Sequence, residues 1–504
     1  MAATTSSGPS SRASEEGAGW QTCTGPGAWK ADVPAGAKPL SWLRPSILWQ
    51  ARNDTVARVL SDPVPAARSR WMELAAQRAQ EAQGTPDFVI SREVGDSFSV
   101  LVLGDTGEGD NPQYAVAYTL AGHAEQADFA FISSDVIYPT GDGYDYPAKF
   151  YHPYRKLPVP IYAVPGNHDW HDGLTGFMHN FCKMDDSGHQ PDFGRGLRAG
   201  LAAMLWRRPQ NTAPRDVPEF PGGPVAERPP PDPIQPAPYF AIDAGRVRFV
   251  GIDTGIKGDI DAAQYEWLQR VSLGCPERPK ILLTGKPIYV DNEYHPGPVI
   301  GMKQKVDDVV TDPRANYVMA IGGDIHNYQR YPVKLADGRT IQYVVSGGGG
   351  AYMHATHRIP PVNINGVTEA EFRCYPLRRD SLARFSQVID QRLFGGRDRL
   401  SIDPASAARY FADRGIVSQA ERQVADALPL GRRIKAALLR RLPSGRLFQR
   451  FGSETFAFTD PPFFKQFLHL EVNKDELTVS CFGVTGCAGT ENLPPVEDGF
   501  TVGW

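Results

Sequence analysis

The segment that decides the fold is Val164-Pro165-Gly166-Asn167-His168-Asp169, which follows directly on the apolar stretch Pro160-Ile161-Tyr162-Ala163-Val164. A strand that ends in Pro-Gly turns sharply, so the next side chains lie at the mouth of a sheet and not inside it. At such a place an amide oxygen is able to bind a metal and an imidazole to contact a phosphoryl oxygen. A carboxylate is able to fix the tautomer of the histidine. Four residues can match by chance, so the prediction of a site depends on further ligands elsewhere in the chain.

The composition is that of a globular protein with a sizeable core. The chain has 504 residues, of which 41% are hydrophobic and 22% charged, and its net charge is −4. This length predicts one large elaborated domain or two domains, and the small net charge neither requires nor excludes an anionic ligand. The six cysteines lie far apart without a Cys-x-x-Cys pair, so we expect reduced thiols, with a Cys481–Cys487 bridge as the alternative.

The N-terminal residues 1–16 are rich in Ser, Thr, Gly and Ala and contain no apolar run. This pattern is typical of neither a secretory signal nor a transit peptide, and it predicts a disordered tail. No apolar stretch of the sequence approaches the ~20 residues that a membrane-spanning helix needs. We therefore expect a cytoplasmic protein.

Short apolar runs alternate with a helical pattern in the first half of the chain. The runs at 97–103, 129–132 and 161–164 are each followed closely by polar residues, and residues 113–125 have helical spacing. This alternation predicts βαβ units and a largely parallel sheet, and open α/β sheets bind ligands at such strand ends. Further buried strands are expected at 239–242, 247–253, 280–283, 317–321 and 341–345.

Two segments differ from this core in composition. Residues 207–238 hold eleven prolines and predict an extended surface insertion. Residues 376–452 have a helical pattern and carry sixteen Lys and Arg against seven Asp and Glu. After them, 467–472 and 476–482 predict a hairpin that returns to the core sheet, which makes the helical segment an insertion. We therefore predict four parts: a tail with an irregular lead-in at 1–90, a core at 91–375, a basic helical insertion at 376–452 and a C-terminal hairpin at 453–504.

Part of the helical insertion, residues 432–450, is basic and amphipathic. Such a helix is able to lie on anionic lipid or to bind nucleic acid. We favour a solvated helix that docks on the acidic remainder of the chain.

Acidic residues stand after two of the other apolar runs. Asp105 follows the first run and Asp135 follows the second. Asp105 and Asp135 are 30 residues apart, and Asp135 and Asn167 are 32 apart. Each interval accommodates one further helix and strand, so we expect these side chains to meet along one sheet edge.

More potential ligands follow the run at 317–321, where Asp324 and His326 stand, and Tyr138 lies three residues after Asp135. Carboxylate, imidazole, amide and phenolate donors together suit Mn, Fe or Zn, and the lack of thiolates disfavours a structural zinc site. Two such ions ~3.5–4 Å apart are able to clamp a phosphoryl group and generate a hydroxide nucleophile.

Four motifs in this order resemble those of the calcineurin-like metallophosphoesterases: Gly-Asp-x-Gly at 104–107, Asp-x-x-Tyr at 135–138, Gly-Asn-His-Asp at 166–169 and Gly-Asp-x-His at 323–326. They most resemble the purple acid phosphatase branch, whose first motif is also Asp-x-Gly and whose second ends in Tyr. The resemblance covers roughly residues 97–350 and the closing hairpin. It implies an α/β (α+β) fold, a four-layer αββα sandwich of two mixed sheets.

The resemblance also implies a dinuclear metal centre. The first ion would be held by Asp105, Asp135, Tyr138 and His326. The second would be held by Asp135 as a bridging ligand, Asn167 and Asp324. His168 would be the catalytic residue that meets the phosphate oxygens, and the further candidates for substrate contact are Asn167, Lys286 and Arg330. For Arg330, an ion pair that supports its loop is the alternative.

One departure from the family pattern concerns the second motif, which normally begins Gly-Asp. Here it is Ser134-Asp135, and Gly141-Asp142 is a competitor that keeps the glycine. We prefer Asp135, because it follows an apolar strand and has Tyr138 three residues later.

Two more departures concern the second ion. Between the motifs at 166–169 and 323–326, the family usually has a further motif with a ligand histidine two residues before a proline, where this chain has Gly285. In the last motif, at 323–326, the family usually has a histidine where this chain has Asp324. The second ion is therefore weakly held, harder (Mg or Mn), supplied with another ligand such as His295, or absent. One hypothesis is that Lys286 places a positive charge where a metal would otherwise bind.

The glycine-rich strand exit at 347–350 is followed by Ala351-Tyr352-Met353-His354, which does not clearly open a helix. A phosphate cradle needs such a helix, so we expect close backbone approach here instead. We expect His354 and His357 to pack the loop.

The implied activity is hydrolysis of a phosphate ester, by a phosphatase or a phosphodiesterase that uses a metal-activated hydroxide. Two divalent or trivalent ions, Fe, Mn or Zn, would serve it, and the substrate would be a phosphate-ester small molecule or a nucleotide. No clear nucleic-acid or membrane partner is indicated. The alternative is a catalytically impaired binding protein that keeps the same fold.

Overall fold

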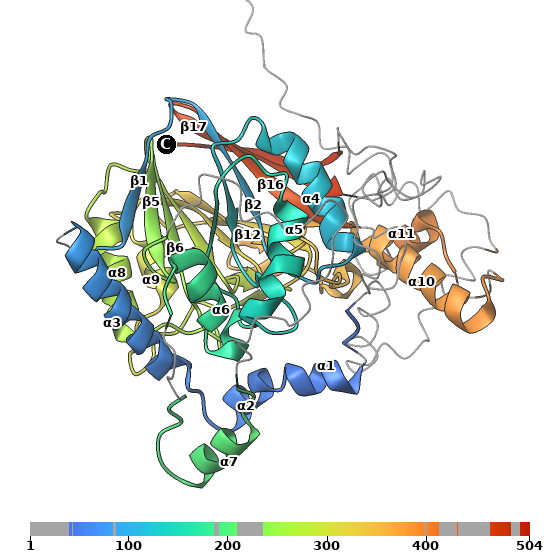
Figure 1. Ribbon diagram of the computed structural model, residues 1–504. Helices are drawn as coiled ribbons and strands as arrows, with labels where there is room; N and C mark the ends of the chain where they lie inside the picture. The colour runs from blue at the N-terminus through green and yellow to red at the C-terminus, as the bar shows by residue number, and fades with distance from the viewer. Residues whose placement is uncertain are drawn as a thin grey trace, which may run out of the picture.

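The computed structural model describes residues 40–42, 44–83, 87–185, 191–208, 235–397, 399, 401–412, 431, 464–484 and 494–504. Most of the proline-rich segment, much of the basic helical segment including 432–450, and Cys487 lie outside these residues. Within the described part, the strands form two large mixed sheets with helices on their outer sides, which confirms the predicted αββα sandwich (Figure 1).

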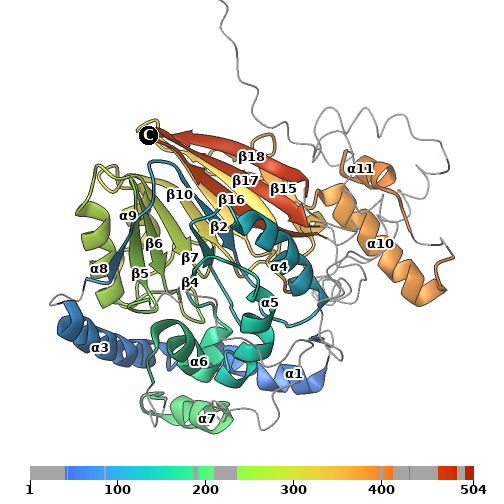
Figure 2. The same ribbon diagram turned by 45° about the horizontal axis from the view of Figure 1, so that its top comes forward.

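One sheet, the β2 sheet, carries the first three predicted strands in parallel and the C-terminal hairpin in antiparallel orientation. Its strands in spatial order are β18 (Val496–Gly503), β17 (Glu476–Val484), β16 (Lys465–Val472), β2 (Phe98–Leu103), β3 (Phe129–Ile132) and β4 (Ile161–Ala163). The pairing of β16 with β2 joins residues far apart in sequence, and Figure 2 shows the two strands side by side. The proposed domain boundaries stay a prediction.

The other sheet, the β10 sheet, contains the remaining predicted strands. Its strands in spatial order are β1 (Val89–Arg92), β5 (Phe240–Ala244), β6 (Val247–Ile252), β7 (Lys280–Thr284), β10 (Tyr317–Gly322), β12 (Thr340–Ser346), β11 (Tyr328–Lys334) and β15 (Arg373–Tyr375). Two short hairpins lie outside both sheets, β8 (Tyr289–Val290) with β9 (Glu293–Tyr294), and β13 (Asn363–Ile364) with β14 (Val367–Thr368). Strands β6, β7, β10 and β12 run parallel, so their carboxyl ends share one edge.

Helices form the two outer layers and one end of the molecule. Helix α4 packs on β16 and β17, and α9 packs on β10. The α-helices are α1 (Pro45–Gln50), α2 (Asn53–Val59), α3 (Val64–Gln83), α4 (Asn111–Ala124), α5 (His152–Tyr154), α6 (Thr175–Phe177), α7 (Leu197–Leu205), α8 (Ala262–Leu273), α9 (Val306–Thr311), α10 (Arg378–Phe394) and α11 (Pro404–Ala412). Within the described residues, no helix combines the length and the apolarity that crossing a membrane requires.

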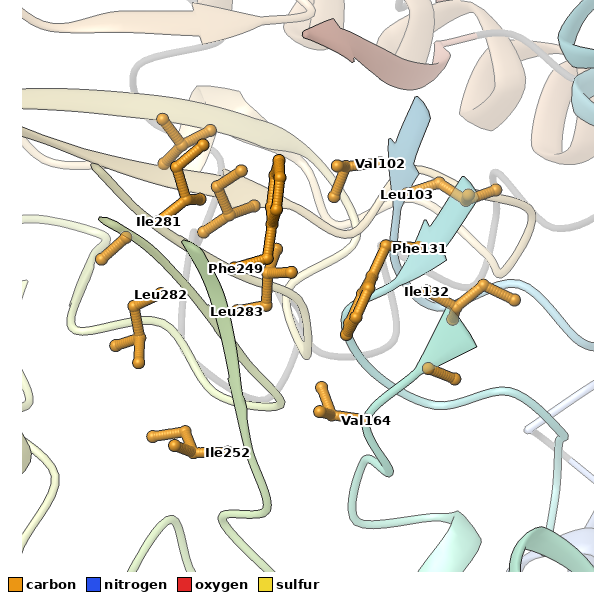
Figure 3. Packing of buried hydrophobic residues seen from close by; sticks show 14 of the residues in the cluster. Val102, Leu103, Phe131, Ile132, Val164, Phe249, Ile252, Ile281, Leu282 and Leu283 are labelled. Carbon is orange, nitrogen blue, oxygen red and sulfur yellow. The ribbon is translucent and has the colours of Figure 1, made fainter. Parts of the chain in front are cut away.

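The two sheets pack face to face through a continuous apolar core (Figure 3). Phe131 of β3 stacks on Phe240 of β5, with ring centroids 6.0 Å apart. A Cβ at Gly251 of β6 would lie 2.7 Å from a methyl group of Val164, so glycine is required for this close approach of the sheets. Each fully buried apolar side chain contributes about 1.5–3 kcal/mol, so this core holds the strand ends rigidly.

Candidate metal centre

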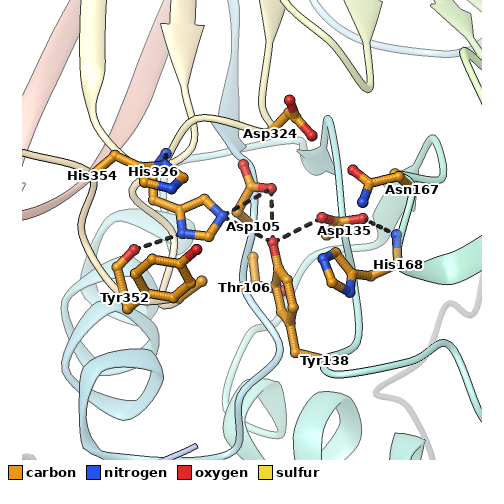
Figure 4. Close-up of polar contacts among 12 residues, drawn as sticks. Asp105, Thr106, Asp135, Tyr138, Asn167, His168, Asp324, His326, Tyr352 and His354 are labelled. Atoms are coloured by element: carbon orange, nitrogen blue, oxygen red, sulfur yellow. Dashed lines mark hydrogen bonds and ion pairs between the residues drawn. The ribbon is translucent and has the colours of Figure 1, made fainter. Parts of the chain in front are cut away.

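The candidate site lies where the carboxyl ends of the two sheets meet (Figure 4). Asp105 and Asp135 follow β2 and β3, and Asn167 follows β4. From the other sheet, Asp324 and His326 follow β10. Parallel strands end at a common edge, so the packing of the two sheets brings these side chains together from distant parts of the sequence.

The hydroxyl group of Tyr138 lies among three buried side chains that could bind a metal ion. It lies 3.0 Å from Oδ1 of Asp105, 2.9 Å from Oδ2 of Asp135 and 3.1 Å from Nε2 of His326. Asp135 is therefore the residue that joins the site. Its competitor, Asp142, instead accepts hydrogen bonds from the Thr140 hydroxyl at 2.7 Å and from the guanidinium of Arg207 at 3.1 Å.

Glycines let the backbone close around the two carboxylates. A Cβ at Gly166 would lie 2.1 Å from Oδ1 of Asp135, and a Cβ at Gly323 would lie 2.3 Å from Cβ of Ser134. The missing side chain at Gly323 therefore leaves room for the unusual serine of the second motif. Asp105 has a left-handed backbone with φ 58°. Such backbone strain at a non-glycine residue persists only where the surroundings hold it, and it clusters at functional sites.

The electrostatics of the site favour a bound cation. Burial raises the pKa of Asp105 well above its ordinary value, and the nearby carboxylates of Asp135 and Asp324 raise it further. Burial lowers the pKa of His326 well below its ordinary value, so its imidazole is neutral and suited to bind a metal. Among the described residues, the buried Oδ2 of Asp105 has no hydrogen-bond partner.

The spacing of the donors also fits one ion. Donor atoms that are neighbours around a small octahedral ion stand about 3 Å apart when each lies about 2.1 Å from it. The three distances around the Tyr138 hydroxyl are close to this value. Within the described residues, no group of three or more His, Cys, Asp and Glu side chains is placed to hold an ion, so Asp105, Asp135 and His326 are a candidate set only together with Tyr138.

His168 is held beside this set by two hydrogen bonds. Its backbone N–H donates to Oδ1 of Asp135 at 2.7 Å, and its ring Nδ1 lies 2.8 Å from the carbonyl oxygen of Pro139. A carbonyl only accepts, so Nδ1 carries a proton and Nε2 is the ring nitrogen left for a ligand. The ring packs on Tyr138 and Trp42, with centroids 4.6 and 5.2 Å away.

Lys286, which follows β7, lies between the two residues expected to bind the second ion. Its ammonium donates to Oδ1 of Asn167 at 3.2 Å and forms an ion pair with Asp324. Burial alone would raise the pKa of Asp324, but the Lys286 ammonium, together with His354 and Arg58, outweighs it and the pKa falls below its ordinary value. The exposed His295, just after β9, lies 3.5 Å from the carboxylate of Glu293.

Arg330 forms an ion pair in the structure, and a substrate contact of this residue stays a prediction. Its guanidinium pairs with both carboxylate oxygens of Asp498 at 2.6 and 3.1 Å and lies over the ring of Phe500. Asp498 neutralises the charge and holds the side chain between β11 and β18, which corresponds to the ion-pair alternative. We therefore omit Arg330 from the substrate contacts proposed below.

Three residues around the site have no clear motif in the sequence. Trp42, in the N-terminal lead-in, packs on His168, and the carbonyl oxygen of Tyr352 accepts from Nδ1 of His326 at 2.6 Å. His354, expected only to pack its loop, accepts a hydrogen bond from the backbone N–H of His326 at 2.9 Å. The glycine-rich exit before Tyr352 was the available signal for the last two residues. Trp42 lies far from every motif, so no local signal indicated it.

Comparisons with known proteins agree with the four motifs. Residues 98–328 match the family model described as calcineurin-like phosphoesterase. Similar solved structures include a purple acid phosphatase from yellow lupin (Lupinus luteus) seeds, with 14% identity over 81% of this chain and 54% of that chain and a TM-score of 0.39. This chain thus spans about half the length of that phosphatase.

Two further solved structures have similar scores. GAP50, the anchor in the inner membrane complex of Plasmodium, is 12% identical over 53% of this chain and 76% of that chain, with a TM-score of 0.36. PhoD is 11% identical over 82% of this chain and 70% of that chain, with a TM-score of 0.34. No curated protein sequence gives a significant match. The family model and the ordered motifs agree: residues 98–328 are similar to the calcineurin-like phosphoesterases.

Proposed function

We propose that this chain is a metal-dependent hydrolase of phosphate esters. The observation that carries the proposal is the position of the Tyr138 hydroxyl among Asp105, Asp135 and His326. These four residues would hold one cation, and oxygen and nitrogen donors of this kind suit Fe, Mn or Zn. When bound, such an ion supplies a Lewis acid and lowers the pKa of a water molecule towards neutrality.

His168 would donate a proton to the leaving oxygen. The Pro139 carbonyl accepts from Nδ1, so Nε2 is the ring nitrogen on the substrate side; with both nitrogens protonated, the ring would pass the Nε2 proton to the leaving oxygen and keep the proton on Nδ1. The backbone of His168 also donates to Asp135, so the ring is placed relative to a metal ligand. We propose that His168 is the catalytic acid of this site.

Two further side chains would bind the phosphoryl group. The amide oxygen of Asn167 accepts from Lys286, which leaves the amide NH₂ of Asn167 to donate to a phosphoryl oxygen. The Lys286 ammonium adds a positive charge on the same side. A phosphomonoester, a phosphodiester or a nucleotide would meet these donors in the same way.

The second candidate function is a binding protein that keeps the fold without turnover. Gly285 and Asp324 favour it, because both stand where the family usually has a histidine ligand. Hydrolysis of a generic phosphomonoester and a generic phosphodiester, by protein loaded in turn with Fe, Mn and Zn, distinguishes the two functions.

A matched pair of variants tests whether the measured turnover comes from the candidate metal centre. Asp105→Asn should abolish turnover, whereas Asp312→Asn, a surface carboxylate paired with Arg314 at 2.7 Å, should retain it. Absence of turnover with all three metals would overturn the proposed activity and leave the binding function.

A further inference from the structure

We propose that the ammonium group of Lys286 takes the place of the second metal ion, so that this centre works with one metal ion and one lysine. This inference rests on the proposed function, because it concerns the same metal centre. Asn167 and Asp324, the residues expected to bind the second ion, both direct an oxygen at Nζ of Lys286.

The charges of this part of the site are already balanced. Asp324 provides one negative charge and Lys286 one positive charge, and the two are in direct contact with side chains that are 27% and 17% exposed. A metal ion bound to the same two oxygens would stand next to the ammonium, and like charges at such a distance repel strongly when they are shielded from water. The lysine therefore excludes a second cation for as long as it stays in place.

The chain also lacks space for the missing histidine. A Cβ at Gly285 would lie 2.9 Å from the carbonyl oxygen of Pro165 and 2.9 Å from Oγ1 of Thr254. These distances are below those that Cβ atoms adopt, so the backbone and its neighbours have closed over the position. The packing around Gly285 therefore excludes a histidine side chain at this position.

The packing also leaves room for the side chain of Lys286. Gly258 has a left-handed backbone with φ 85°, and a Cβ there would lie 3.0 Å from Cδ of Lys286. The absence of a side chain at Gly258 thus leaves room for the aliphatic part of Lys286. Gly258, Gly285 and Asp324 together accommodate a lysine in the place of a metal ion.

As a consequence, we expect the metal ion and the Lys286 ammonium to have different roles. Asp105, Asp135, Tyr138 and His326 would hold the ion that supplies a water molecule of lowered pKa, as proposed above. Lys286 would donate to a phosphoryl oxygen the one N–H that Asn167 and Asp324 leave unused, because its ammonium has three donors and no coordination sites.

Metal stoichiometry tests the inference without relying on turnover. Metal-free wild-type protein is dialysed against increasing Mn²⁺, bound metal is counted by elemental analysis, and the Mn²⁺ electron paramagnetic resonance spectrum is recorded. We expect one equivalent per chain and the spectrum of an isolated ion. Two equivalents with the spectrum of a coupled pair would overturn the inference and leave the proposed function intact, whereas no bound metal would overturn both.

Two variants make the test specific to Lys286. Lys286→Met removes the charge at similar length, so we expect a second equivalent of Mn²⁺ to bind at least about tenfold more tightly than it binds to wild type. The control, Lys257→Met, removes a nearby lysine that lies 3.6 Å from Asp62, and it should bind metal like wild type. Unchanged second-site affinity in Lys286→Met would overturn the inference, and the wild-type spectrum gives an independent answer if this variant fails to fold.

Discussion

Replacement of His168 by alanine tests the proposed proton transfer. The change removes the ring nitrogen Nε2 but keeps the backbone N–H that donates to Asp135, so the metal ligands should stay in place. Proton transfer by a positioned side chain contributes about 10²–10⁴-fold to a rate, which corresponds to roughly 3–5 kcal/mol of transition-state stabilisation. The half-buried ring also packs on Tyr138 and Trp42, so its loss should lower the free energy of unfolding by about 1–2 kcal/mol.

The assay measures kcat for a phosphomonoester at saturating substrate and equal metal content. We expect kcat of His168→Ala to fall by about 10²–10⁴-fold. His179→Ala is the matched control, because His179 is exposed and forms a surface pair with Asp185 at 2.7 Å. An unchanged kcat in His168→Ala at full metal occupancy would refute the role of this histidine.

Three further predictions concern the metal centre, the buried charges and the pH dependence. Tyr138→Phe should weaken Mn²⁺ binding about 10- to 100-fold in calorimetry, because it removes one of the four proposed ligand atoms, and loss even of a group that only supports a ligand costs about this much; equal affinity would contradict this. Arg68→Met leaves Asp253 buried without its ion-pair partner at 2.7 Å and should lower unfolding free energy in urea by about 3–5 kcal/mol; a loss below about 1 kcal/mol would contradict it. Burial, with Asp142 nearby, raises the pKa of Asp172 to about 8, so its ionisation destabilises the folded state as pH rises from the ordinary carboxyl value through 8. Asp172→Asn should therefore raise Tm relative to wild type at alkaline pH more than at acidic pH, and a pH-independent difference would contradict this.

The strand ends and their ligands were predictable because their signals are local. Apolar runs closely followed by polar residues indicated β2, β3 and β4, and the motif residues Asp105 and Asp135 stand just beyond the first two. The choice of Asp135 over Asp142 followed from the tyrosine three residues later, and the structure places Asp135 at that tyrosine's hydroxyl.

Contacts between distant segments were not predictable in the same way. Arg330 and Asp498 lie 168 residues apart, and their pairing depends on how β11 and β18 lie in the folded molecule. Trp42 reaches His168 from the N-terminal lead-in, where periodicity and spacing carry no information about the site. The sequence showed that Lys286 stands beside a lost ligand, but only the packing of the two sheets shows that its ammonium contacts both Asn167 and Asp324.

We propose that one metal ion, held at the Tyr138 hydroxyl, is enough for hydrolysis of a phosphate ester. Titration of metal-free protein with Mn²⁺, with the initial rate of phosphomonoester hydrolysis recorded at each step, tests it most directly. We expect the rate to rise linearly and to level off at one equivalent of Mn²⁺ per chain. A plateau at two equivalents would contradict the single-ion centre, and a rate that does not rise would contradict the metal-dependent activity itself.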